Sequence, residues 1–499
     1  MSRGLKNLIA CGAALGLVTV VPQAQADAPG AKHMTATLIP GQPVLPLGNF
    51  DLATLHYVVQ EFQLSGDAAS YRSAGPAADD GTWNAEVDQH APFTTRVVVV
   101  RPQDAAKFNG TVVVEWLNVS AGTDSGPDWN YTHRELIRQG YAYVGVSAQK
   151  GGIDGGGMNL NIPGVMPIKK ANPQRYAQLD HPGDAFAYDI FTQAGRAVRE
   201  TRTTRLLGSL TPKHVIATGE SQSAGFLTTY VDAVEPIAKV FDGFMIHSRF
   251  GGGAPLSGNM ASAMRAAPAK GLPIRSDLKK PVLIFISESD LMFPNGYLAA
   301  RQPDNDHLRT WEVAGTAHAD SYTLGGAAVD SGSAPIDVLA KAFAPSTTVV
   351  GMPLTLPMNS ALQHHYVMQS ALAALNRWIV AGQAPPHAQR LNVTESAPPQ
   401  LVLDAQGNAT GGVRSPWMDV PTSRLSGLGQ TGGGMMAALF GVTEPFTAAK
   451  LNELYPGGKP EYIDRFNASL KSAINAGFIL PADEAEIKAL AAHSFSMGQ

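Results

Sequence analysis

Residues 214–226 read HVIATGESQSAGF, and this stretch carries the strongest indication of the fold. The apolar and β-branched run at 215–218 favours a strand that is buried on both faces of a sheet. The run leads into Gly-x-Ser-x-Ser and then into a segment that favours a helix. This order matches the Gly-x-Ser-x-Gly nucleophile elbow, with Ser223 in place of the last glycine. The pattern predicts that Ser221 is a nucleophile at a sharp turn between a strand and a helix.

The residues around Ser221 suit that chemistry. A nucleophile at a strained corner needs small residues two positions before and after it, and Gly219 and Ser223 stand there. The N-terminus of the following helix offers its dipole and unpaired N–H groups. We therefore expect the N–H of Gln222 to stabilise the oxyanion of a reaction intermediate. Two alternatives stay open, namely Ser223 as the nucleophile and a turn without a catalytic role.

The partners of such a serine follow it along the chain in the order acid, then histidine. Residues 281–287 read PVLIFIS, a predicted buried strand that ends in Glu288 and Asp290. A second strand at 310–313 is followed by a glycine turn and His318. His318 is the predicted general base, and the acid would hold its imidazole in the correct tautomer. Asp290 is the preferred acid because it stands where the loop after the strand begins, and Glu288 is the alternative.

A second oxyanion donor is expected in the loop after the strand at 111–117. That loop reads NVSAGTDSG over residues 118–126 and lacks the His-Gly-Gly run of lipase-like enzymes. The backbone N–H of Asn118 or Val119 is the predicted donor.

Five residues near these strand ends are candidates for contact with a substrate: Trp116, Trp129, Tyr131, His247 and Arg249. The three aromatic residues flank the loop at 118–126, and core packing explains them equally well. His247 and Arg249 end a strand at the sheet edge where sites of α/β proteins open. Capping of the sheet is the alternative role for this pair.

Short apolar strands alternate with helical segments after about residue 55. The predicted strands span residues 57–64, 96–101, 111–117, 141–147, 215–218, 243–247, 281–287 and 310–313. Helices are expected near 130–139, 185–207, 222–234, 297–301, 358–380, 447–454 and 462–476. Since the first strands follow one another directly and the later ones alternate with helices, we expect an α/β fold. Its central sheet would be mostly parallel, with an antiparallel start and helices on both faces.

The domain organisation follows from the same pattern. We expect one α/β domain over residues 27–386, with the antiparallel start at 55–117. Pro-rich and Gly-rich connections at 251–277 and 324–357 are interpreted as loop insertions. Residues 387–499 are expected to form a C-terminal extension packed on that domain. All three segments are long enough to cover a site.

Residues 1–26 have the features of a secretory signal peptide. Arg3 and Lys6 precede an apolar run over residues 8–21, and residues 24–26 read AQA, which suits cleavage before Asp27. A transmembrane anchor is less favoured, because the run is shorter than the roughly 20 residues of a spanning helix. Lipidation at Cys11 is also less favoured, since this cysteine lies near the start of the run. We therefore expect a secreted or periplasmic protein.

Composition excludes several classes of function. Cys11 is the single cysteine, so the mature chain would lack disulfides, a cysteine nucleophile and thiolate metal ligands. The formal net charge is −4 and 16% of residues are charged, which gives no basic excess for binding nucleic acid. No dinucleotide or P-loop motif indicates a cofactor, and the adjacent His364 and His365 cannot share one helix face to bind a metal. No segment after the leader is apolar for long enough to span a membrane.

The sequence resembles the secreted bacterial alpha/beta hydrolase domain proteins that carry a Gly-x-Ser-Gln-Ser elbow. Besides the elbow, the resemblance rests on residues 108–119, 241–249, 300–304, 311–320 and 411–417, and it covers nearly all of the mature chain. It implies an α/β-hydrolase fold and serine-dependent ester hydrolysis. It supports Ser221 and His318 individually, and it leaves the choice between Asp290 and Glu288 open.

The expected function is hydrolysis of a small-molecule carboxylic ester through an acyl-enzyme on Ser221, without a cofactor. An amidase or peptidase with the same triad is the nearest alternative. A catalytically silent binding protein with this fold is a second alternative.

Overall fold

The computed structural model describes residues 34–497 except 158, 159, 161, 163, 261–269, 350, 432 and 433. The predicted leader at 1–26 lies outside the described residues. In the part of the chain that is described, none of the helices combines the length and hydrophobicity needed to cross a membrane.

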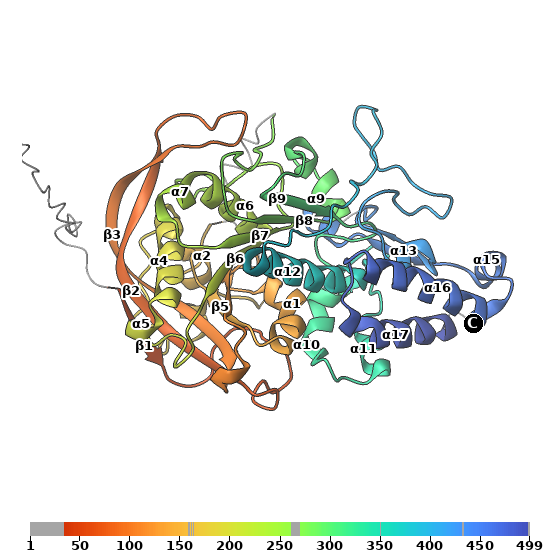
Figure 1. Ribbon diagram of the computed structural model, residues 1–499, viewed down its shortest axis with the longest axis horizontal. Helices are drawn as coiled ribbons and strands as arrows, with labels where there is room; N and C mark the ends of the chain where they lie inside the picture. The colour runs from red at the N-terminus through yellow and green to blue at the C-terminus, as the bar shows by residue number, and fades with distance from the viewer. Residues whose placement is uncertain are drawn as a thin grey trace, which may run out of the picture.

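A nine-stranded sheet forms the centre of the molecule (Figure 1). Its strands in chain order are β1 (Thr35–Ile39), β2 (Tyr57–Ser73), β3 (Ala85–Pro102), β4 (Thr111–Trp116), β5 (Ala142–Val146), β6 (His214–Glu220), β7 (Gly243–His247), β8 (Val282–Ile286) and β9 (Leu308–Glu312). Across the sheet they follow the order β1-β2-β3-β5-β4-β6-β7-β8-β9. The first four neighbours pair antiparallel, and β5 to β9 run parallel.

This sheet confirms the predicted fold class, a mostly parallel sheet with an antiparallel start. All eight predicted strands are present, and two features extend beyond them. The β2–β3 hairpin continues to the pair Ser73–Ala85, well past the predicted apolar segments, and β1 adds an edge strand. The outer half of β3 is exposed and polar, so it has no apolar run that would reveal it in the sequence.

Helices cover both faces of the sheet (Figure 1). In chain order the helices are α1 (Pro127–Arg138), α2 (Lys150–Ile153), α3 (Ile168–Ala171), α4 (Ala187–Arg199), α5 (Thr201–Thr204), α6 (Gln222–Thr229), α7 (Glu235–Ala238), α9 (Glu288–Met292), α10 (Ala327–Val329), α11 (Ile336–Ala342), α12 (Gln363–Ala381), α13 (Pro416–Asp419), α14 (Gly434–Ala437), α15 (Ala448–Leu454), α16 (Gly458–Asn475) and α17 (Glu484–Met497). The short pairs β10 (Thr348–Val349) with β11 (Met352–Pro353) and β12 (Ser423–Ser426) with β13 (Val442–Pro445) lie outside the main sheet.

Alternating side chains of the central strands build two separate cores. Val112 and Val114 of β4 pack with α4 and α6 on one face, whereas Val113 points into the core under α1 and α12 on the other. This alternation is a consequence of the two-residue repeat of a strand. Because both faces are covered, strands such as β4 are apolar at nearly every position.

The C-terminal segment shares the second core. Phe466 of α16 and Leu490 of α17 belong to the same buried cluster as Val113 of β4. Charged contacts add to this packing, since Arg138 of α1 pairs with Asp483 at 2.7 Å. Figure 1 shows α17 beside α11 and α16, and α16 beside α13.

We expect the Phe466→Ala variant to lose about 3–5 kcal/mol of unfolding free energy, because a fully buried aromatic ring leaves a cavity behind. Chemical denaturation should still show one cooperative transition, since α16 shares its core with the sheet. The Val380→Ala variant serves as the control, because Val380 is 54% exposed and should change stability by less than about 0.5 kcal/mol. A separate early transition that leaves the sheet untouched would contradict this expectation.

Candidate active site

Ser221 stands at a sharp turn between β6 and α6. Its backbone has φ 57° and ψ −116°, a conformation that residues other than glycine rarely adopt. The Ser221 N–H donates to the carbonyl of His247 at 3.0 Å, and its carbonyl accepts from the N–H of Gly225 at 3.1 Å. The turn is therefore held by the end of β7 on one side and by the first turn of α6 on the other.

The small neighbours of Ser221 are in contact with each other. A Cβ atom added to Gly219 would lie 3.1 Å from the carbonyl oxygen of Ser223 and 3.3 Å from its Cβ, so a larger residue would push the turn apart. Ser223 is fully buried, and its hydroxyl donates to the carbonyl of Leu117 at 3.3 Å. Ser221 by contrast is partly exposed. This difference favours Ser221 over Ser223 as the candidate nucleophile.

His318 and Asp290 are hydrogen-bonded partners. The Nδ1 atom of His318 lies 2.6 Å from Oδ1 of Asp290. The backbone N–H of His318 donates to the hydroxyl of Ser289 at 2.7 Å, and the ring of Phe250 stacks on the imidazole with centroids 5.5 Å apart. These contacts fix both the tautomer and the direction of the imidazole.

Asp290 lies in the first turn of α9 rather than in a loop. Ser287 caps this helix: its N–H and hydroxyl donate to Oδ2 of Asp290 at 2.9 and 2.6 Å. One carboxylate oxygen is thus held by the cap, and the other faces His318.

Glu288, the alternative acid in the sequence, does not hydrogen-bond to His318 and instead accepts hydrogen bonds from two turns. Its oxygens accept the N–H of Gly315 at 2.5 Å, the N–H of Gly427 at 2.9 Å and the hydroxyl of Ser426 at 3.1 Å. Burial raises the pKa of this carboxyl to about 7. Glu288 connects the turn before His318 to the C-terminal segment, and Asp290 is the acid that contacts the histidine.

The two members of the His318–Asp290 pair shift each other's pKa. Burial disfavours both charged forms, but the attraction to His318 and the hydrogen bonds from Ser287 lower the pKa of Asp290 to about 2. The carboxylates of Asp290 and Glu220 likewise outweigh the burial of His318 and raise its pKa to about 9.

Glu220 is a site residue that the sequence reasoning missed. Its Oε1 lies 3.3 Å from Nε2 of His318, and its Oε2 accepts from the side-chain amide of Asn118 at 3.0 Å. Burial raises the pKa of Glu220 to about 7. Its place directly before Ser221 was the only signal in the sequence, and the contact with His318 depends on a loop almost a hundred residues away.

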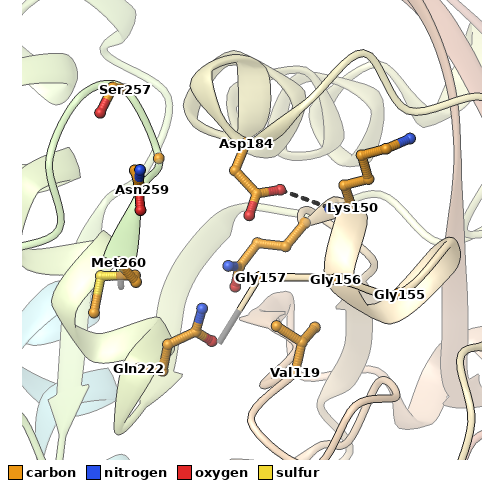
Figure 2. Close-up of a pocket in the computed structure, with 13 residues that line it drawn as sticks. Val119, Lys150, Gly155, Gly156, Gly157, Asp184, Gln222, Ser257, Asn259 and Met260 are labelled. Atoms are coloured by element: carbon orange, nitrogen blue, oxygen red, sulfur yellow. Dashed lines mark hydrogen bonds between the residues drawn. The ribbon is translucent and has the colours of Figure 1, made fainter. Parts of the chain in front are cut away.

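The candidate oxyanion donors are Gln222, Asn118 and Val119. Gln222 is the first residue of α6, where backbone N–H groups have no partner inside the helix. The Asn118 N–H is already bonded to the carbonyl of Ser125 at 2.9 Å, which corrects its prediction as a donor. Val119 lies next to it, and Val119 and Gln222 both line a cavity of 260 Å³ (Figure 2). We therefore prefer Val119 as the second donor.

The three aromatic candidates lie in the core, which corrects their prediction as pocket residues. The indole N–H of Trp116 donates to Gln149 at 3.1 Å, and that of Trp129 donates to the carbonyl of Leu47 at 3.0 Å. Tyr131 stacks on His364 with ring centroids 4.2 Å apart. All three side chains are almost completely buried and offer no open surface to a substrate.

His247 and Arg249 are also fully buried, so the prediction that they contact substrate is corrected as well. Nδ1 of His247 lies 2.7 Å from Oδ1 of Asp128, and its Nε2 lies 3.2 Å from Nε2 of His364. The guanidinium of Arg249 donates to the carbonyl of Leu272 at 2.6 Å and lies over the ring of Tyr297. Both residues hold neighbouring segments in place.

One buried group within the described residues has the geometry of a metal site. Ligand atoms of Asp330, His365 and Glu486 lie within 4.8 Å of one another. Arg134 forms ion pairs with both carboxylates of this group. A buried guanidinium already balances their charge and would repel a metal ion, so we assign no metal to this group.

We expect the Glu220→Gln variant to have a lower pKa at His318, because the substitution removes a negative charge 3.3 Å from Nε2. The pKa should fall further in Asp290→Asn, since Asp290 is the larger of the two charge contributions that raise it. NMR titration of the histidine rings, with the His318 signal assigned through His318→Gln, measures both shifts. An unchanged pKa in Glu220→Gln would show that this carboxyl does not act on His318.

Several solved structures are similar to parts of the chain. One is described among two fungal esterases from Rhizomucor miehei, at 14% identity over 46% of this chain and 67% of that one, with a TM-score of 0.24. A serine hydrolase without a lid from Xanthomonas campestris gives 12% identity, 49% and 83% coverage and a TM-score of 0.26. A carboxylesterase from Lactobacillus plantarum gives 11% identity, 46% and 75% coverage and a TM-score of 0.25. A comparison with curated proteins found no significant match.

The sequence pattern of the alpha/beta hydrolase domain family matches residues 21–489. This match spans the described sheet, the elbow and α16, and it ends within α17. The chain therefore belongs to the alpha/beta hydrolase domain family.

Proposed function

We propose that the protein is a serine hydrolase that cleaves carboxylic esters through an acyl-enzyme on Ser221. The observation that carries the proposal is the hydrogen bond between His318 and Asp290. On its other side the imidazole of His318 contacts Glu220, the residue directly before Ser221. In this proposal Ser221, His318 and Asp290, which follow the parallel strands β6, β9 and β8, take the roles of nucleophile, base and orienting acid.

The reaction would begin with attack of the Ser221 hydroxyl on the ester carbonyl. Nε2 of His318 takes the hydroxyl proton, while Asp290 on Nδ1 stabilises the imidazolium that forms. The N–H groups of Gln222 and Val119 would hold the oxyanion. The alcohol then leaves with the proton from His318, and a water molecule activated by the same imidazole hydrolyses the acyl-enzyme.

Glu220 sets a condition on this mechanism. Its carboxylate occupies the Nε2 side of His318 at 3.3 Å, which is the side that the base must turn toward Ser221. A hydrogen bond between nucleophile and base is often completed only when substrate is bound. The mechanism therefore requires His318 to exchange Glu220 for Ser221 as its partner on Nε2.

Esters are the proposed substrates because an alcohol leaves more readily than an amine, so the demand on His318 as an acid is smaller. We expect p-nitrophenyl butyrate to be cleaved with a kcat/KM at least about 100-fold above that of the matching p-nitroanilide. The Ser221→Ala variant should lose at least about 10³-fold in kcat and all labelling by a fluorophosphonate probe.

The Ser223→Ala variant is the matched control for that measurement. Ser223 is fully buried and bonded to Leu117, so its replacement should leave labelling in place. Labelling that persists in Ser221→Ala and disappears in Ser223→Ala would overturn the choice of nucleophile. Comparable rates on the ester and the anilide would favour an amidase instead.

The two acids should behave differently when each carboxylate is neutralised. We expect Asp290→Asn to lower kcat by about 10³–10⁴-fold with little change in folding, because the imidazole then adopts the wrong tautomer. Glu288→Gln should keep kcat within about tenfold and lose about 1–3 kcal/mol of stability, because it disturbs the bonds to Gly315 and Gly427. Ester kinetics and thermal denaturation of both variants give the answer, and the reverse ranking in kcat would exchange their roles.

We also propose that the enzyme acts outside the cytoplasm. The support is the leader-like composition of residues 1–26, and cleavage before Asp27 would remove Cys11 with it.

A further inference from the structure

A cavity lined by Val119 and Gln222 lies on the oxyanion side of the candidate site. It has a volume of 260 Å³, below the roughly 300 Å³ at which pockets for whole drug-sized ligands begin, so it suits one part of a substrate. Figure 2 shows its two walls: Ser257, Asn259 and Met260 on one side, and Val119 with the glycines at 155–157 on the other.

Gln222 connects this cavity to the reaction centre. Its backbone N–H is the candidate oxyanion donor, and its side chain extends into the cavity toward the space below Asp184 (Figure 2). Only 3% of Gln222 is exposed, and its Oε1 has no hydrogen-bond partner among the described residues. A buried amide oxygen without a donor is unfavourable, so a hydroxyl group that enters the cavity would be stabilised by donating to it.

A second acceptor faces the same space. Oδ1 of Asp184 accepts the backbone N–H of Lys150 at 2.7 Å, which fixes the direction of the carboxylate. The ammonium of Lys150 turns away from the cavity: it pairs with Asp154 at 2.5 Å and donates to the carbonyl of His181 at 3.1 Å. Among the described lining residues, Asp184 therefore gives the cavity a negative charge, and no cation faces it to receive an anionic group.

The remaining walls suit a carbon chain that bears hydroxyl groups. Val119 and Met260 supply apolar contacts. Residues 155, 156 and 157 are glycines with φ of 89°, 91° and 72°, which other residues rarely adopt. Because glycine has no side chain, this wall leaves the cavity open. Gln149 also lines the cavity, and its amide oxygen accepts from the indole N–H of Trp116 at 3.1 Å.

We propose that this cavity binds a hydroxyl-bearing part of the ester substrate, whose O–H groups donate to Oε1 of Gln222 and to the carboxylate of Asp184. The inference rests on the proposed function, since it takes Ser221 as the point of attack. It narrows the substrate class to neutral hydroxylated esters. It also gives Gln222 two tasks, one through its backbone and one through its side chain.

Two series of esters test the proposal and tell the acyl side from the alcohol side. The first compares ethyl butyrate, ethyl 3-hydroxybutyrate and the anionic monoethyl succinate. The second compares propyl butyrate with 2,3-dihydroxypropyl butyrate. In the series whose hydroxyl enters the cavity, we expect the hydroxylated ester to exceed the plain one in kcat/KM by about five- to tenfold. The anionic ester should be the poorest substrate of the first series.

The ratio of the two kcat/KM values is then measured in variants, because a general loss of activity cancels in a ratio. Gln222→Met removes the acceptor at similar size and should bring the ratio to within about twofold of one. Asp184→Asn keeps the bond to Lys150 and should also lower the ratio. The matched control is Gln193→Met: Gln193 bonds the backbone of Asp67 and lines no part of the cavity, so the ratio should stay at the wild-type value.

A binding measurement separates this proposal from the proposed function. Calorimetry on Ser221→Ala should show tighter binding of the hydroxylated ester by about fivefold, and the added Gln222→Met change should abolish that difference. If wild-type protein neither hydrolyses esters nor reacts with a fluorophosphonate, the proposed function is wrong. The calorimetry would still test whether the cavity binds a hydroxylated group. Equal binding and equal kcat/KM of the plain and hydroxylated esters in both series would overturn the inference.

Discussion

The backbone of Ser221 is the constraint on which the site depends. A positive φ costs a residue with a Cβ atom about 1–2 kcal/mol, so the surrounding structure has to hold it there. The N–H bond to His247 and the contact between Gly219 and Ser223 do so. As a result, β6 must stop at Glu220, and α6 must start at once with its free N–H groups beside the nucleophile. The oxyanion donor and the cavity contact of Gln222 both follow from this one turn.

Buried carboxylates fix the other turns at the same edge of the sheet. Glu115 at the end of β4 accepts the N–H groups of Asp128 and Trp129, both at 2.9 Å, and thereby fixes the start of α1. Glu288 does the same for the turn at Gly315 and the distant Gly427. In both cases burial raises the pKa of the carboxyl, and backbone donors stabilise the ionised form. At this edge of the sheet, buried carboxylates thus join neighbouring segments by accepting their backbone N–H groups. Of the two acids in α9, Glu288 is used in this way and Asp290 faces a histidine.

The sequence predicts the strands and the elbow because strands that are buried on both faces are continuous apolar runs. It does not separate Asp290 from Glu288, since both lie in one turn of α9 and their partners come from Ser287, Gly315 and the remote Ser426. The roles assigned to Trp116 and Trp129 fail for a related reason, because a core aromatic and a pocket aromatic have the same local pattern. Their burial is decided by α4, α12 and the C-terminal helices, which pack from far along the chain.

His247, whose carbonyl holds the elbow, belongs to a buried chain of four side chains. The number of protons in this chain limits the charges that the four side chains can carry. Asp128, His247, His364 and Asp320 are joined in this order by contacts of 2.7, 3.2 and 3.1 Å. Three hydrogen bonds need three protons, whereas two neutral imidazoles supply only two. Burial lowers the pKa of His364, so a positive charge on that imidazole is disfavoured. The chain ends in a buried carboxylate on each side, and the backbone carbonyl of His247 receives the N–H of Ser221 at 3.0 Å. The position of the nucleophile thus depends on a buried chain of hydrogen-bonded side chains that no substrate reaches.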